Sequence, residues 1–197
     1  DEKEIEVQHI VTLEKWFESQ KQKKLEAKGQ AQEMADQGVK ELILVAQETT
    51  VYGTDIYGKK SLHVLLKELC RIKGIRWIRV LYCYPEEIYD ELIQTMAESK
   101  KICHHLHLPL QSGSSRVLKE MNRRYDKEKY LLLVDKIRKA IPDISLTTDI
   151  MVGFPGETEE DFQETLDVVR KANYDTAFTF IYSKRSGTPA AGMENQV

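Results

Sequence analysis

Polar side chains that could bind a ligand stand directly after apolar segments of this sequence. Asp149 lies within the apolar run 146–152, where a carboxylate needs a hydrogen-bond partner. Gln111-Ser112-Gly113-Ser114 follows another run and offers amide and hydroxyl groups suited to a ribose or a carboxylate. Gly153-Phe154-Pro155-Gly156 is a glycine turn that lets a ligand approach the backbone closely. Each turn is equally compatible with a plain helix start, so neither identifies a ligand by itself.

A metal site is the second chemistry that the residue types allow. Cys103, His105 and His107 alternate and would point to one face of a strand. Side chains two apart on one strand stand nearly parallel, and no fourth ligand is evident, so we expect no metal there. The three cysteines, Cys70, Cys83 and Cys103, are odd in number and far apart. This spacing disfavours disulfides and indicates a reducing cytoplasm.

The elements that must position these groups alternate along the chain. Short apolar runs predict strands at residues 41–46, 77–82, 106–110, 146–152 and 177–182. Helical periodicity predicts helices at residues 62–72, 85–96, 115–121, 130–140 and 158–172. Thr158, followed by Asp161, resembles the capping box of the last helix. Such alternation predicts an α/β fold whose parallel sheet is open or curled into a partial or full β/α barrel, with its ligand at the carboxyl ends of the strands.

The first 36 residues differ from the rest of the chain in charge content and in the spacing of their apolar residues. They are highly charged, and Ile10, Leu13, Trp16 and Phe17 recur at helical spacing. We therefore expect one or two amphipathic helices in a divergent segment 1–36, followed by the β/α core at residues 37–197. The basic run at residues 21–24 is interpreted as a solvated helix face rather than an RNA contact.

Composition limits the classes of partner. The 197 residues carry 29 basic and 32 acidic side chains, for a net charge of -3, which gives no footprint for general nucleic-acid binding. The longest apolar runs are too short to cross a membrane, and the acidic N-terminus does not resemble a signal peptide. We therefore expect a cytoplasmic globular protein without membrane contacts.

Several segments together resemble the radical S-adenosylmethionine methylthiotransferases. The segments with this likeness span residues 108–114, 121–125, 146–158, 178–183 and 187–191. The second half of the chain is most similar to the tRNA enzyme that methylthiolates isopentenyl-adenosine beside the anticodon. Residues 44–50 and 77–85 instead resemble the sister enzyme that modifies an aspartate of a small-subunit ribosomal protein.

The resemblance implies a partial or full β/α barrel that binds S-adenosylmethionine at its strand ends, with tRNA or the ribosomal protein as partner. By this likeness Gln47 lies near the methionine part of the cofactor. Gln111, Ser112 and Gly113 match the strand near the ribose, whereas Asp149, Gly153, Gly156 and Glu157 match the strand whose loop approaches the adenine. In the family, a 4Fe-4S cluster cleaves S-adenosylmethionine and thereby starts the radical chemistry.

The sequence departs from the family where the cluster should be held. The family places a Cys-x3-Cys-x2-Cys loop after its first barrel strand, and the matching residues 12–20 contain no cysteine. Cys70 is the first cysteine of the chain, and Glu, Ser or Gln replace thiolates poorly. The likeness therefore implies a core whose first strand and cluster loop were lost or replaced and which is inactive as this chain. A non-catalytic module that binds S-adenosylmethionine or RNA, or a remnant with only partner contacts, are the alternatives. A replaced first strand would also leave a sheet edge open to self-association.

Overall fold

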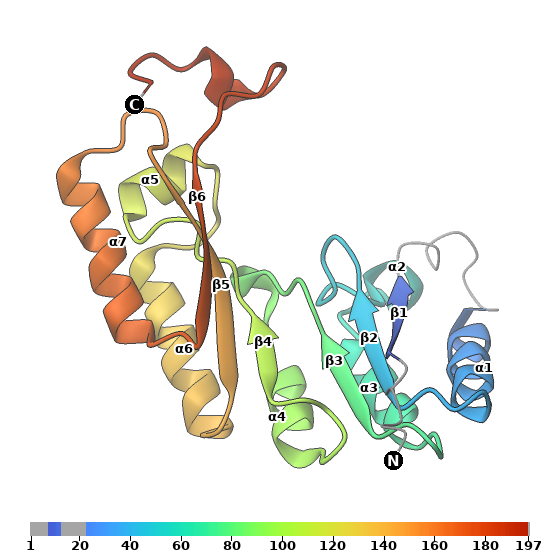
Figure 1. The fold of residues 1–197 in the computed structure, drawn as a ribbon. Helices are drawn as coiled ribbons and strands as arrows, with labels where there is room; N and C mark the ends of the chain where they lie inside the picture. Colours follow the sequence, from blue (N-terminus) through green and yellow to red (C-terminus); the bar gives the residue numbers. More distant parts are fainter. Residues whose placement is uncertain (1–7, 13–22, 197) are drawn as a thin grey trace, which may run out of the picture. The chain divides into compact units, whose positions relative to one another are not determined.

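The computed structural model describes the backbone of residues 8–12 and 23–196, and the side chains of residues 28–196 except that of Ile56. The chain divides after His107 into two compact units. In Figure 1 the first unit runs from blue to green and the second from yellow-green to red.

The first unit contains a parallel three-stranded sheet in the order β1 (Gln8–Thr12), β2 (Glu41–Val45) and β3 (Trp77–Val80). Its remaining elements are α1 (Lys23–Asp36), α2 (Thr54–Tyr57), α3 (Leu62–Cys70), a 3-10 turn at Pro85–Glu87, α4 (Asp90–Glu98) and β4 (His105–His107). Leu42, Leu44 and Ile78 of the sheet and Leu66 and Leu69 of α3 are fully buried. Burial of this apolar surface is the main force that holds the unit together.

The strand β1 corrects the expectation for the N-terminal segment. Residues 8–12 pair in parallel with β2, from Gln8 opposite Glu41 to Thr12 opposite Val45, rather than forming a helix. Ile10, Val11 and Thr12 are β-branched residues, which fit a pleated strand better than a helix. The helical expectation is confirmed for α1, whereas Leu13, Trp16 and Phe17 lie outside the described residues. Of the inference that the first strand and the cluster loop were lost or replaced, the loss of the strand is therefore wrong, while the loop lies outside the described residues.

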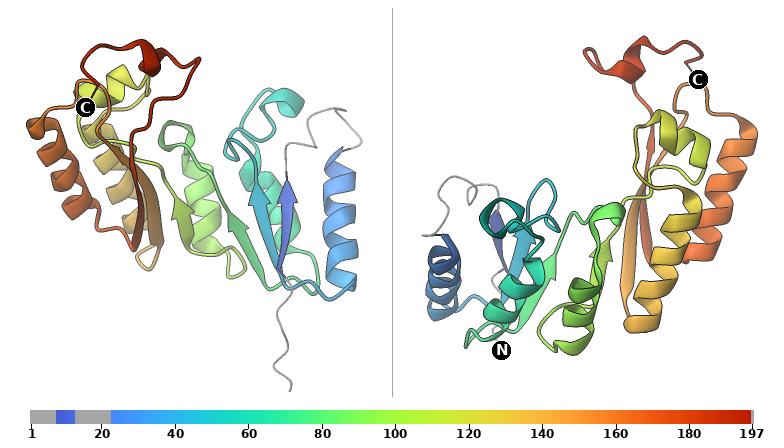
Figure 2. Two further views of the ribbon diagram at one scale, coloured as in Figure 1. Left: turned by 45° about the horizontal axis from the view of Figure 1, so that its top comes forward. Right: turned by 180° about the vertical axis from the view of Figure 1, so that it is seen from behind.

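The second unit is built on the parallel strands β5 (Ser145–Val152) and β6 (Thr176–Ile181). Three helices belong to it: α5 (Ser115–Glu120), α6 (Lys127–Ala140) and α7 (Glu159–Ala172), followed by a 3-10 turn at Pro189–Gly192. The helices α6 and α7 lie together on one side of the strand pair (Figures 1 and 2). Burial alternates along β5, with Leu146, Thr148 and Ile150 on the buried face. Asp149 and Met151 therefore lie on the opposite, more open face.

Parallel pairing in both units and the alternation of strands and helices confirm the α/β class expected from the sequence. None of the helices in the described part of the chain is both long enough and apolar enough to span a membrane.

Candidate functional site

A pocket of about 590 Å³ lies at the carboxyl ends of β5 and β6, within the second unit. Its size falls in the range typical of small-molecule sites. The polar lining residues are Gln111, Glu120, Asn122, Arg123, Asp149, Tyr182, Ser183, Arg185 and Thr188. The apolar lining residues are Met121, Met151, Phe154, Phe180, Ile181, Pro189, Ala190 and Met193.

Gln111 and Asp149, both expected from the sequence, meet in this pocket. The backbone of Gln111 joins the edge of β5: its N–H donates to the Asp149 carbonyl at 2.8 Å, and its carbonyl accepts from the Met151 N–H at 2.8 Å. Gln111 has a φ of 64°, a left-handed conformation that is uncommon for a residue with a side chain. The same backbone ladder therefore holds the Gln111 amide and the Asp149 carboxylate beside one cavity.

Ser112 and Gly113 do not line the pocket but join α5 to α7. The N–H of Gly113 donates to Oγ1 of Thr165 at 2.9 Å, and the Ser112 Oγ lies 3.4 Å from the same oxygen. A Cβ atom at Gly113 would lie 2.4 Å from the Cα of Thr165, so only glycine fits this contact. The direct contact of these two residues with a ligand stays a prediction.

The turn at residues 153–157 supplies one wall of the pocket through Phe154. Gly153 and Gly156 have φ values of 72° and 76°, which glycine adopts without strain. A carboxylate oxygen of Glu157 accepts a hydrogen bond from the Gly153 N–H and closes the turn. Burial raises the pKa of Glu157 against the opposing effect of this hydrogen bond. The two glycines and Glu157, predicted from the sequence, thus shape the wall without being among the residues that line it.

Two buried polar atoms flank Phe154 and have no hydrogen-bond partner in the structure. They are Oε1 of Glu157 and the hydroxyl of Tyr182, whose ring packs edge-on against Phe154 with centroids 5.5 Å apart. Native proteins satisfy nearly all such groups, because an unpaired buried polar atom costs about 1–3 kcal/mol. Tyr182 lines the pocket and Glu157 does not, so the orphaned Tyr182 hydroxyl fits a region that is completed by a polar ligand such as a nucleoside.

An ionic network behind the turn was missed by the sequence reasoning, apart from its capping box. Arg116 of α5 donates from Nη2 to the Gly156 carbonyl at 2.7 Å and pairs with the carboxylate of Asp161. Asp161 also accepts from the Ser114 hydroxyl at 2.5 Å and from the Thr158 N–H at 2.9 Å, which confirms the predicted capping box. Burial alone would raise the pKa of Asp161, but the bonds from Arg116, Ser114 and Thr158 hold it far below its usual range.

The opposite wall comes from β6 and the segment after it. Phe180 and Ile181 are 52% and 82% exposed, and Arg185, Thr188 and Met193 follow them around the pocket. We call residues 183–196 the C-terminal strap. Periodicity predicted β6 but not the contribution of the strap, because a segment without regular structure carries no burial pattern.

Gln47 lies in the first unit, where it is exposed at the end of β2, so its predicted contact with the methionine part stays a prediction. The neighbouring residue Glu48 has a defined structural role. The Glu48 carboxylate accepts from the backbone N–H of Thr50 and of Tyr84, each at 2.8 Å, and so ties together the segments after β2 and β3. Burial raises the pKa of Glu48, although these hydrogen bonds oppose the rise.

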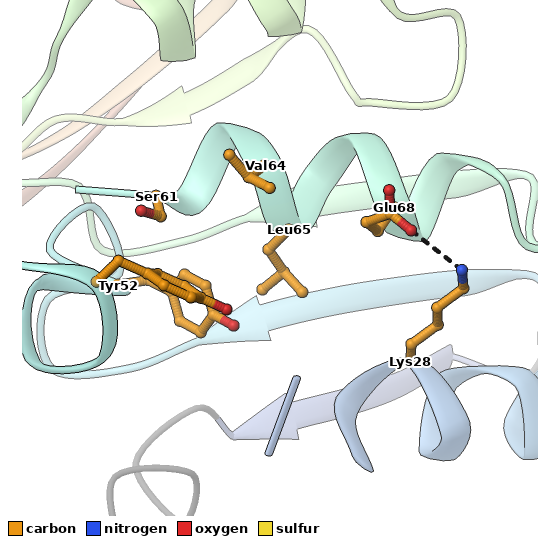
Figure 3. A pocket seen from close by; sticks show the side chains of 7 residues that line it. Lys28, Tyr52, Ser61, Val64, Leu65 and Glu68 are labelled. Atoms are coloured by element: carbon orange, nitrogen blue, oxygen red, sulfur yellow. Dashed lines mark hydrogen bonds and ion pairs between the residues drawn. The ribbon is translucent and has the colours of Figure 1, made fainter. Parts of the chain in front are cut away.

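A second, much smaller cavity of about 30 Å³ lies between α1 and α3 in the first unit. Figure 3 shows Lys28 of α1 reaching Glu68 of α3, and the two charged groups are 3.0 Å apart. Tyr52 and Leu65 form the apolar side of the cavity, and burial raises the pKa of Tyr52 to about 12. A cavity of this size holds water but no organic ligand.

The described residues do not fit an iron–sulfur cluster. Cys70 lies 3.2 Å from the Ser99 hydroxyl, Cys83 is fully buried, and Cys103 is half-buried on another element. Burial raises the pKa of both Cys83 and Cys103, which opposes the thiolate form that a cluster requires. In the described part of the chain, no three His, Cys, Asp or Glu side chains are placed to hold a metal ion. Residues 13–22, directly after β1, lie outside that part and contain neither cysteine nor histidine.

Comparison with known proteins places these features in a family. The family model of the radical SAM superfamily matches residues 9–169, from within β1 to within α7. The chain belongs to the radical SAM superfamily. It is 54% identical over 166 residues to the tRNA-2-methylthio-N(6)-dimethylallyladenosine synthase of Caldicellulosiruptor saccharolyticus, covering 84% of this chain and 35% of that protein. It is 53% identical over 168 residues to the ribosomal protein uS12 methylthiotransferase RimO of Lachnoclostridium phytofermentans, covering 85% of this chain and 38% of that protein.

Solved radical SAM structures share the fold. The methyltransferase TsrM from Kitasatospora setae superposes with a TM-score of 0.64 at 17% identity, over 83% of this chain and 32% of that one. Coproporphyrinogen III oxidase (HemN) from Escherichia coli gives 0.57 at 22% identity, over 88% and 41%. The resemblance to methylthiotransferases and the partial-barrel α/β fold are thereby confirmed. The chain spans just over a third of the length of the methylthiotransferases it matches, and its expected division at residue 36 stays a prediction.

Proposed function

We propose that this chain is the S-adenosylmethionine-binding core of a methylthiotransferase whose substrate is an isopentenyl-adenosine in tRNA. The observation that carries the proposal is the pocket at the ends of β5 and β6, which brings Gln111 and Asp149 together with the aromatic wall of Phe154. Amide and carboxylate groups hydrogen-bond the hydroxyls of a ribose, and an aromatic wall accepts the face of a purine. The orphaned Tyr182 hydroxyl beside Phe154 supports the same ligand class.

Each residue has a distinct part in this proposal. Gln111 and Asp149 orient the nucleoside by hydrogen bonds, while Gly153, Gly156 and Glu157 fix the turn that carries Phe154. Ser112 and Gly113 act from behind by holding α5 against α7, and Gln47 is assigned to the methionine end. Bound S-adenosylmethionine would supply the methyl group of the transferred methylthio unit.

The nature of the substrate is the finer part of the proposal. The relatives include enzymes named for dimethylallyladenosine and for ribosomal protein uS12, and the chain is similar to both. Phe180, Ile181 and Met193 give the pocket an apolar side that suits a prenyl group. The ribosomal-protein enzyme is the second candidate, and a cytoplasmic location suits either partner.

The donor set of this chain argues that it does not cleave the cofactor on its own. Fe–S clusters are held by thiolates, and the segment after β1 has none. We therefore propose that the chain binds S-adenosylmethionine without generating a radical. This keeps a non-catalytic module that binds S-adenosylmethionine or RNA as the alternative to a methylthiotransferase core.

Calorimetry with S-adenosylmethionine tests the binding proposal. We expect the double variant Asp149→Ala and Gln111→Ala to bind at least about tenfold more weakly, since two hydrogen-bonding groups are removed. Lys139→Ala is the matched control, because Lys139 pairs with Asp135 on the exposed face of α6 and does not line the pocket. Unchanged affinity in the double variant would remove the pocket assignment, and no binding by the unmodified chain would remove the proposed function.

Two further measurements separate the alternatives. Anaerobic incubation with iron and sulfide should yield neither a cluster absorbance nor reductive cleavage of S-adenosylmethionine, and either signal would contradict the non-radical assignment. Competition between an isopentenylated anticodon hairpin and a uS12 peptide should favour the hairpin. Preference for the peptide would select the ribosomal-protein enzyme instead.

A further inference from the structure

Arg116 lies on an exposed helix surface and contacts two other elements of the second unit. Its side chain is half exposed and absent from the pocket lining, yet Nη2 reaches the Gly156 carbonyl of the turn at 2.7 Å. The same nitrogen pairs with Asp161 at the start of α7. One guanidinium therefore connects α5, the turn at residues 153–157 and α7.

The partner of Arg116 is itself held in place. Asp161 is 6% exposed, and its carboxylate also accepts from the Ser114 hydroxyl and from both the N–H and the hydroxyl of Thr158. A carboxylate fixed by this many bonds offers the guanidinium a single position. The Arg116 side chain is therefore anchored at one end and can restrain the turn at the other.

The restraint extends to the C-terminal strap through the backbone of one residue. The carbonyl of Gly156 accepts from Arg116, while the N–H of Gly156 donates to the Asn195 carbonyl of the C-terminal strap at 2.8 Å. The turn carries Phe154 on one wall of the pocket, and the strap carries Arg185, Thr188 and Met193 on the other. Both walls are thus tied to the same glycine.

We propose that Arg116 is a positioning residue that sets the shape of the pocket by fixing the backbone of Gly156 between α5 and the C-terminal strap. The proposal rests on the proposed function for the identity of the ligand, but not for the mechanical role of Arg116. Arg116 touches no ligand in this scheme; it holds the turn and the strap at the spacing at which Phe154 and Met193 face the same cavity.

Hydrogen–deuterium exchange of the full chain, combined with S-adenosylmethionine titration, tests this role. Arg116→Met keeps the aliphatic stem and removes the donors, and Arg116→Lys keeps the charge beside Asp161 but not the planar guanidinium. Lys127→Met is the matched control, since it breaks the 2.7 Å pair between Lys127 of α6 and Glu164 of α7 without touching the turn. Exchange is followed separately in the turn, the strap, β5 and α7.

In Arg116→Met we expect exchange in the turn, the strap and the first turn of α7 to rise about tenfold, and affinity for S-adenosylmethionine to fall about fivefold to tenfold, with β5 and the later turns of α7 unchanged. The exchange and the affinity of Arg116→Lys should lie between those of Arg116→Met and those of the unmodified chain. Lys127→Met should match the unmodified chain in both measurements. Exchange in the turn like that of the unmodified chain, or a uniform rise across β5 and α7, would overturn the proposal. A chain that binds no S-adenosylmethionine while its exchange pattern follows Arg116 would refute the proposed function and leave the positioning role supported.

Discussion

At the scale of single residues, the carboxylate of Asp161 has two structural roles. It completes the capping box with Thr158 and it binds the guanidinium of Arg116, with Ser114 as a further donor. Its buried position on its own would raise its pKa, and the bonds from the surrounding donors lower the pKa below its usual range. The charge state of this one residue therefore affects both the stability of α7 and the geometry of the pocket.

The pH dependence of unfolding should reveal this charge. The pKa of Asp161 lies below its unfolded value of 3.8, so its contribution to stability is full above that value and is lost as the pH falls below it. At pH 7 we expect Asp161→Asn to lower the free energy of unfolding by about 2 kcal/mol, because the charged hydrogen bonds are weakened. The gap between variant and unmodified chain should narrow toward about pH 2.5 in urea denaturation series. A gap that is constant with pH would show that the carboxylate is not charged in the folded chain.

At the scale of elements, the packing contact between the start of α5 and α7 determines where the elements around the pocket lie. Gly113 lies directly against the backbone of α7, with room for no Cβ beside Thr165 and the Glu164 carbonyl. Ser114 next to it both caps α5 and donates to Asp161 at the start of α7. The position of α5, and with it Arg116, is thus determined by backbone packing as well as by charge.

Gly113→Ala is therefore expected to be destabilising by about 1–3 kcal/mol, because the added methyl must push the two elements apart. Gly29→Ala is the contrasting variant: Gly29 lies within α1 with nothing within 4 Å of a Cβ atom, so alanine should stabilise the chain by about 1 kcal/mol. Chemical denaturation of both variants gives the comparison. Equal stabilities for Gly113→Ala and the unmodified chain would mean that α5 and α7 can move apart without a loss of free energy of unfolding.

These elements also show what the sequence could and could not predict. Apolar periodicity located β2, β3, β5, β6 and the main helices, because burial repeats at the spacing of each element. It failed at β1, where charged neighbours and helically spaced apolar residues obscured a five-residue strand whose evidence is its pairing with β2. Likewise the close contact of Gly113 with Thr165, far away along the chain, could not be predicted from the sequence. Contacts between distant residues leave no local pattern.

At the scale of the whole molecule, β6 is the most exposed of the strands whose side chains the structure describes. All six of its residues are exposed, including Phe178 at 53%, and its sequence contains no charged residue. An open sheet edge was expected from a replaced first strand; β1 is present as an edge strand of its own sheet, and β6 is an edge strand of the other sheet. Uncharged, apolar strands of this kind pair readily with other chains.

Self-association through β6 is the resulting expectation, and Thr179→Lys tests it. Thr179 is exposed on β6 and does not line the pocket, so a lysine there adds a charge to the edge without altering the site. Light scattering at increasing concentration should show larger particles for the unmodified chain than for the variant. Equal particle sizes would place any association elsewhere on the surface.

Asp161 takes part in both the helix cap and the contact with Arg116. This shared role constrains which substitutions its partners can accept. Replacing Ser114, Arg116 or Thr158 removes a partner from the same carboxylate, so the effects of two such replacements will not sum. The first loss already leaves the acid short of donors, and a second costs less or more than it would alone. Substitutions at these three positions are therefore expected to be coupled in their effects on stability.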